Sequence, residues 1–151
     1  VFNHPANFSK SDESTQPDTD KGRMHNHSFF LMLRAVRAYQ DRYHPKLESL
    51  GLNLIEARIL LVLNDLSGIG EEELVVHLHT QIDEARAALI NLSDRGLVAQ
   101  QGDRYRLTDV GQTKANECWN LAEAHADETF EGFGEEQVTT FTDVLRRLIK
   151  Q

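Results

Sequence analysis

The stretch TQIDEARAALINLSDRGLVAQQGDRYRLTDVG, residues 80–111, decides the fold. Within it, 82–94 carries apolar residues at helical spacing, and a glycine follows where helices commonly end. Two short strand-like runs, 97–101 and 104–108, then flank Gly102-Asp103, a two-residue connection typical of a tight β-hairpin. The stretch therefore predicts one helix followed directly by a two-stranded hairpin.

Three helices are predicted upstream of this stretch. The first covers 26–44 and ends or kinks at Pro45, because proline lacks the backbone donor that a helix interior needs. The second begins after Asn53, the expected N-cap, and Glu56 follows three residues later as in a capping box. The third, 71–79, opens with three glutamates, which suit the positive end of the helix dipole.

The other elements follow from similar signals. The segment Ser67-Gly68-Ile69-Gly70 is predicted to be a turn, and it is no phosphate loop because no Gly-Lys-Ser/Thr follows it. Beyond the hairpin, Thr108 or Asp109 is expected to cap a helix over 110–131, and a last helix covers 135–149. The predicted fold is mainly α with a small β-hairpin.

Charge and composition exclude several classes of protein. With 16 Lys and Arg against 24 Asp and Glu, the formal net charge is −8, which argues against a protein coated in positive charge. The single cysteine rules out an intramolecular disulfide and a cysteine-based zinc finger, and it favours a reducing, cytoplasmic compartment. No apolar run approaches the roughly 18 residues of a membrane span, so no membrane partner is expected.

Two helices joined by a short turn and followed by a β-hairpin make a winged helix-turn-helix. Here the helices are 71–79 and 82–94, and the hairpin 97–108 is the wing. The second helix of such a pair is the one that enters the major groove of DNA. We therefore expect the side chains of 82–94 to carry any base recognition.

The residues around the wing resemble the MarR family of bacterial transcriptional regulators. Leu92-Ser93-Asp94-Arg95-Gly96-Leu97-Val98 is similar to the family's Leu-x-x-x-Gly-Leu-Val segment, and Leu107-Thr108-Asp109-Val110-Gly111 to its Leu-Thr-(Asp/Glu)-x-Gly segment. The resemblance covers about Met24 to Gln151. It implies a homodimer with intertwined terminal helices, which binds pseudo-palindromic double-stranded DNA and responds to a small-molecule effector or an oxidant.

The expected organisation is a polar tail followed by a single MarR-like domain. Residues 1–23 are dominated by polar side chains and favour a frayed arm, although docking of Phe2 or Phe8 on a neighbour stays open. The seven residues from Ser28 to Arg34 are too apolar for an ordinary surface helix and predict a subunit contact. The domain is expected over 24–151. Within it, the dimerisation helices are expected over 24–50 and 111–151, and the winged helix-turn-helix over 54–110.

Two features depart from the family pattern. The family's wing usually carries an Asp-x-Arg-x-x-Arg type segment in a longer hairpin, whereas this tip is only Gly102-Asp103, followed by Arg104 and Arg106. The groove helix also begins with Asp83 and Glu84, whose carboxylates repel phosphate although they can accept from cytosine N4. Both features put insertion of a wing arginine and tight phosphate contact in question.

Nine residues of the helix-turn-helix and wing are the candidate DNA contacts. They are Thr80, Gln81, Asp83, Arg86, Ala87, Asn91, Arg95, Arg104 and Arg106. Residues 68–110 hold four basic and eight acidic groups, so we expect weak binding or a low salt slope per subunit. The alternative is that Arg86 and Arg95 only pair with Asp83, Glu84 or Asp94 on a solvated helix face.

A ligand pocket is the regulatory device that the family resemblance implies. Its expected place is between the first helix, the second helix and the base of the winged domain. The candidate lining residues are Phe29, Met32, Leu33, Arg37, Tyr43, His44 and Trp119. An anionic ligand would be held by Arg37 or His44, while the alternative is that all these residues only pack the dimer core.

No catalytic, cofactor or metal site is predicted. The seven histidines include the pairs His25/His27 and His77/His79, but two-residue spacing points the side chains of a helix in different directions. Cys118 has no adjacent cation to lower its pKa, so a packed thiol is favoured over an oxidation sensor. No nucleophile–base pair or paired-carboxylate motif is present, and we expect no enzyme.

Two functions remain open at this point. The first is a homodimeric DNA-binding regulator on a pseudo-palindromic operator, modulated by a small ligand. The second is a winged-helix dimer with lost or weak DNA binding that acts as a protein-interaction module or ligand sensor, which the acidic segment 68–110 favours.

Overall fold

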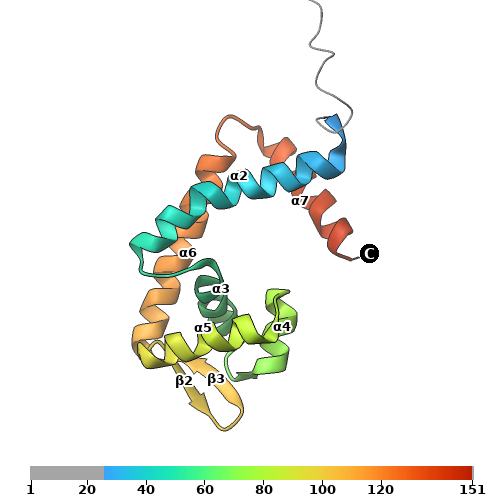
Figure 1. The fold of residues 1–151 in the computed structure, drawn as a ribbon. Coiled ribbons are helices and arrows are strands. Elements are labelled where there is room, and N and C mark those ends of the chain that lie inside the picture. The colour runs from blue at the N-terminus through green and yellow to red at the C-terminus, as the bar shows by residue number, and fades with distance from the viewer. Residues whose placement is uncertain (1–25, 151) are drawn as a thin grey trace, which may run out of the picture. The chain divides into compact units, whose positions relative to one another are not determined.

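The computed structural model describes residues 26–150, which divide between Arg37 and Ala38 into two compact units. Helix α2, Ser28–Ser49, begins in the first unit and ends in the second, and all elements from α3 onward belong to the second (Figure 1). The tail predicted over 1–23 lies outside the described residues. The predicted class, mainly α with a small β-hairpin, is confirmed.

Helix α2 continues through Pro45 to Ser49, so the predicted end at His44 is wrong. Proline costs the helix one backbone hydrogen bond. Tyr43 and Leu47, which lie two residues to either side of it, are both buried in the core, and this packing holds the helical path. The helix ends where the backbone N–H groups of Leu50 and Leu52 both donate to the Leu47 carbonyl, at 2.9 and 3.1 Å.

Helix α3, Leu54–Asp65, begins with the predicted capping box. The Glu56 backbone N–H donates to Asn53 Oδ1 at 2.9 Å, and the Asn53 N–H donates to Glu56 Oε2 at 3.0 Å. These bonds satisfy donors that would otherwise be unpaired at the helix start. Helices α4, Glu71–Leu78, and α5, Ile82–Asp94, follow within one residue of their predicted bounds.

The wing has one more strand than predicted. Strands β2, Val98–Gln101, and β3, Arg104–Leu107, form the expected hairpin around Gly102-Asp103. Strand β1, Ile69–Gly70, pairs antiparallel with β3 and gives the sheet order β1-β3-β2. The segment predicted as a turn is therefore partly a strand, because its pairing partners lie 34 and 36 residues away in sequence and a two-residue strand has no periodicity of its own.

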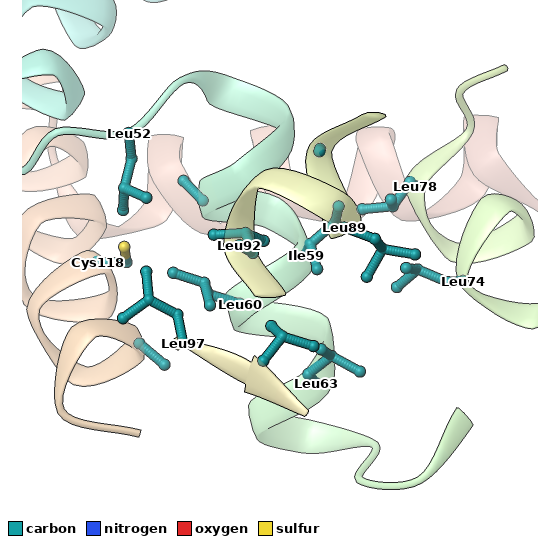
Figure 2. Close-up of a cluster of buried hydrophobic side chains, with 14 of the residues drawn as sticks. Leu52, Ile59, Leu60, Leu63, Leu74, Leu78, Leu89, Leu92, Leu97 and Cys118 are labelled. Carbon is teal, nitrogen blue, oxygen red and sulfur yellow. The ribbon is translucent and has the colours of Figure 1, made fainter. Parts of the chain in front are cut away.

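A leucine-rich core joins α3, α4 and α5 to the wing. Figure 2 shows these side chains pointing toward one another from the three helices, with Leu97 and Cys118 at one side. The fully buried large side chains of this core include Leu47, Ile59, Leu60, Leu63, Leu74, Leu78, Leu89, Leu92 and Cys118. Each buried leucine contributes about 1.5–3 kcal/mol, so this core sets the position of α5.

The two motifs that resemble the MarR family contact each other. Thr108 N–H donates to the Leu97 carbonyl at 3.1 Å, and its hydroxyl donates to the Gly96 carbonyl at 2.6 Å. The same hydroxyl accepts from the Gly111 N–H at 3.0 Å, which makes Thr108 the N-cap of α6, Asp109–Thr129. A Cβ on Gly111 would lie 1.8 Å from the Leu97 carbonyl oxygen. The glycine is therefore required by close backbone packing and not by its own φ angle.

Helix α7, Glu135–Ile149, ends the described chain at its predicted position. Apolar side chains recur along it at helical spacing, yet none of its residues is buried within the described chain. Phe141, Val144 and Leu148 are each 48–49% exposed, and Ile149 is 80% exposed. We define these four residues as the α7 apolar face.

Among residues 26–150, no helix is long and apolar enough to cross a membrane.

Candidate nucleic-acid interface

Helix α5 has one buried and one exposed face. Ala85, Ala88, Leu89 and Leu92 face the core, whereas the predicted contacts Gln81, Asp83, Arg86, Ala87 and Asn91 are exposed. Thr80 is half-buried, and its hydroxyl donates to Glu84 Oε2 at 2.6 Å, which holds that carboxylate at the start of the helix. The helix therefore presents its N-terminal turns to solvent, as a groove-reading helix must.

Arg86 is held by two carboxylates on the exposed face. Its Nε lies 2.7 Å from Glu71 Oε1 at the start of α4, and its guanidinium nitrogen lies 3.5 Å from Asp83 Oδ1. The alternative that the sequence left open, pairing of Arg86 with a neighbouring carboxylate, is therefore present in the structure. The partner Glu71 comes from another helix and was not among the carboxylates predicted for it.

Glu56 joins α3 to the C-terminal half of α5. It is almost fully buried, it caps α3, and it accepts a hydrogen bond from the Asn91 side-chain amide. Arg95 lies 3.6 Å from the same carboxylate. A buried carboxylate needs such compensation, so in this structure Asn91 and Arg95 are engaged in positioning α5 against α3.

The two arginines of the wing differ in whether they have an interaction partner. Arg104 lies 3.7 Å from Glu73 Oε2 and donates to the Gly68 carbonyl, so it is tied to the start of α4 and to β1. Arg106 is exposed and has no carboxylate within ion-pairing distance in the described part of the chain. Both lie on β3 two positions apart, so they project to the same face of the sheet.

The predicted ligand-lining residues occupy different surroundings. Phe29, Met32, Leu33 and Arg37 belong to the first unit, and the first three are exposed to about half. Trp119 is also half exposed, whereas Tyr43 is buried. Of the seven predicted lining residues, only His44 lines a concavity of about 410 Å³ that the structure forms beside Leu47, Glu48 and Leu52–Ile55. The ligand site stays a prediction.

A buried histidine is the polar feature that the sequence did not single out. His125 on α6 is 1% exposed, its Nε2 lies 3.2 Å from the Tyr39 carbonyl oxygen, and its ring stacks on Tyr43 with centroids 4.9 Å apart. Its Nδ1 has no hydrogen-bond partner among the described residues. A single histidine in a polar helix carries no sequence signal for burial, which only the packing of α2 on α6 creates.

The same cluster shifts the pKa values of its neighbours. Burial is the main cause that raises the pKa of Tyr43 to about 12, with smaller contributions from Tyr39 and Cys118. Burial also raises the pKa of the Cys118 thiol, which is fully enclosed. A protonated, enclosed thiol is unreactive, which favours packing over oxidation sensing at this position. Within residues 26–150, no three His, Cys, Asp or Glu side chains are placed to hold a metal ion.

Several solved structures that match this fold are MarR family proteins. A MarR family transcriptional regulator from Silicibacter pomeroyi matches with a TM-score of 0.76 at 22% identity, over 84% of this chain and 96% of that one. A regulator from Bordetella bronchiseptica, whose DNA binding is regulated by 6-hydroxynicotinic acid, matches with a TM-score of 0.75 at 20% identity, over 82% and 95%.

A MarR family protein from Mycobacterium tuberculosis in complex with DNA matches with a TM-score of 0.73 at 24% identity, over 81% of this chain and 97% of that one. The same protein has been solved with salicylic acid. No family model matches the chain. The chain therefore has the winged-helix fold of MarR family regulators, as the motifs around the wing predicted.

Proposed function

We propose that this protein is a DNA-binding transcriptional regulator that acts as a homodimer on a pseudo-palindromic operator. The observation that carries the proposal is the exposed N-terminal half of α5, set between the start of α4 and a β-hairpin wing. The fold is shared over most of the chain with a protein solved on DNA. In the proposed complex α5 enters the major groove, and the wing contacts the phosphate backbone.

The α7 apolar face supports the dimer. Three of its side chains are half exposed and one almost fully exposed, which is unusual for one face of a terminal helix in a monomer. A second copy that covers this face and the apolar start of α2 would bury more than about 2,000 Å² in total, as obligate dimers do. The two α5 helices would then lie roughly 34–36 Å apart, one duplex turn.

A small-molecule effector is part of the proposal. Its support is that two of the matching proteins are described with small aromatic acids, 6-hydroxynicotinic acid and salicylic acid. For this chain we propose binding of a small organic ligand by the residues predicted above, with Arg37 or His44 as the residue that contacts an acid group.

The test is selection of a binding sequence from a random duplex library, followed by titration at two salt concentrations. Arg86→Ala is expected to weaken binding to the selected duplex by about 1–3 kcal/mol and to relax preference at one base step per half-site. Arg104→Ala is expected to weaken binding to all sequences alike and to lower the salt slope by about 1. If Arg86→Ala changes neither affinity nor preference, α5 does not read the groove.

A second candidate function is a winged-helix dimer that binds a protein partner. Residues 54–110 hold five arginines against ten aspartates and glutamates. This balance opposes a phosphate surface and suits a basic partner. Failure to recover any preferred duplex from the library would favour this second candidate.

A further inference from the structure

The first turn of α4 faces both of the regions proposed to contact DNA. Its Glu71 pairs with Arg86 of the groove helix, and its Glu73 pairs with Arg104 of the wing. Glu72 lies between them, is exposed, and has no cation within ion-pairing distance among residues 26–150. Two consecutive elements, α5 and the wing, are therefore tied electrostatically to one helical turn that neither sequence motif includes.

The remaining cations of the winged helix offer little compensation. Arg95 pairs with the buried Glu56, and Arg58 donates to the Leu78 carbonyl on the inner side of the domain. Within the described chain, Arg106 is the one arginine of residues 54–110 with no carboxylate or carbonyl partner. A phosphate that approaches this surface therefore meets Arg106, which is unpaired within residues 26–150, while Arg86 and Arg104 already face carboxylates.

The two pairs differ in strength. Glu71 Oε1 is buried and accepts no hydrogen bond within the described residues, so the Arg86 charge, 2.7 Å away, is what compensates it. Withdrawing Arg86 leaves a buried carboxylate oxygen without a counter-charge. Glu73 and Arg104 are each 58% exposed and 3.7 Å apart, and solvent screens such a pair. The hold on Arg86 is therefore the stronger one.

We infer that Glu71 and Glu73 are internal competitors of DNA phosphate, which set the affinity and salt dependence of the proposed interface by pairing with Arg86 and Arg104. The inference rests on the proposed DNA binding, and it identifies two glutamates that limit the affinity of that binding. To contact DNA, each arginine must leave its glutamate or bring that carboxylate close to phosphate. Either route costs affinity, and removing the glutamate charge restores it.

The variants that test this inference are Glu71→Gln and Glu73→Gln, with Glu72→Gln as the matched control. All three remove one negative charge from the same helical turn, but only the first two remove a carboxylate that pairs with an arginine. Glutamine at 73 keeps a side-chain oxygen that can accept from the Gly70 N–H, as Glu73 does at 3.1 Å, so the capping of α4 is retained. Thermal unfolding of each variant checks that the fold is intact.

The probe is a fluorescein-labelled mixed-sequence duplex of roughly 30 base pairs, which is long enough for two half-sites. It is titrated with the full chain, and binding is followed by fluorescence anisotropy. The salt concentration is varied between roughly 50 and 200 mM, because binding through phosphate contacts changes strongly over this range. Glu71→Gln is expected to tighten binding about two- to fivefold per subunit beyond the gain in Glu72→Gln, and Glu73→Gln by less. The salt slope should rise in both, because more phosphates are neutralised. In an Arg86→Ala background the extra gain from Glu71→Gln should vanish.

Three results would overturn the inference. If the chain binds the duplex but Glu71→Gln gains no more than Glu72→Gln, only net charge matters. If Glu71→Gln weakens binding, Glu71 orients Arg86 and does not compete for it. If neither the natural chain nor any variant binds duplex DNA at the lowest salt, the proposed function itself fails, and that outcome is distinct from the first two.

Discussion

The winged-helix core and helix α7 are both rich in apolar residues, but those of the core are buried and those of the α7 apolar face are exposed. In the core, six leucines of α3, α4 and α5 are at most 1% exposed, namely Leu60, Leu63, Leu74, Leu78, Leu89 and Leu92. On α7, the apolar face stays about half exposed or more. Both regions are helical for local reasons, since α3 and α7 each begin with a side chain three residues inside the helix that accepts from the N-cap backbone.

The contrast shows that apolar periodicity predicts a helix but not its partner. The core helices find their partners within the same chain, and this closes the domain around α5. The α7 apolar face has no comparable cover among the described residues, and Phe141 stays 48% exposed although its ring packs on Phe130 at a centroid distance of 5.8 Å. A second copy of the chain is the partner that we propose for it.

The largest expected effect is a loss of stability of the winged-helix core. Gly111→Ala places a Cβ against the Leu97 carbonyl and should destabilise the domain by about 3 kcal/mol or more, since neither backbone can move without disturbing β2 or α6. Urea unfolding followed by circular dichroism measures it. Gly134→Ala is the matched control, because its Cβ would meet only the end of a flexible side chain at 3.8 Å, and it should cost less than about 1 kcal/mol. Equal costs would contradict the close packing of the two motifs.

The next largest effect is a loss of dimerisation through the α7 apolar face. Leu148→Glu puts a charge on the α7 apolar face, near its C-terminal end, and should raise the dimer dissociation constant at least about a hundredfold, because a buried unpaired carboxylate is costly. Sedimentation at micromolar concentration is the measurement. Thr139→Glu, on the opposite face of the helix, should leave the dimer unchanged. A natural chain that is already monomeric would refute the proposed covering of this face.

The smallest expected effect is the change in folding stability with pH. Tyr43 has a folded pKa of about 12 against 10.0 for an ordinary tyrosine, so the unfolded state loses its proton first as pH rises. Its contribution to stability is complete below pH 10 and should be lost by about pH 12, at a cost of about 2–3 kcal/mol. The raised pKa of Cys118 acts in the same direction from pH 9 upward.

Unfolding free energies at pH 8, 10 and 11 test this expectation, and Tyr43→Phe is the control. The phenylalanine variant keeps the ring that stacks on His125 but removes the group that ionises. It should therefore lose less stability between pH 8 and 11. An identical decline in both proteins would show that ionisation of Tyr43 does not drive the loss. The α7 apolar face contains no ionisable side chain, so dimerisation should change less than stability over this range.

Elements whose signals are local could be predicted from the amino-acid sequence alone. The N-caps at Asn53 and Thr108, the bounds of α5 and α7, and the hairpin around Gly102-Asp103 depend on residues within a few positions of one another, and all appear as predicted. The family motifs were recognisable for the same reason, although why Gly111 is a glycine became visible only when Leu97 was placed against it.

Features that join residues distant in sequence could not be predicted, because they depend on how the chain folds. Strand β1 exists because β3 lies beside it, and α2 passes through Pro45 because Tyr43 and Leu47 are anchored in the core on either side. At the candidate interface, the sequence identified Arg86 and Arg104 but not their partners at the start of α4. An ion pair depends on two long side chains meeting in space, and no sequence period records that meeting. Burial strengthens the attraction within such a pair but also costs desolvation, and the fold alone sets how buried each pair is.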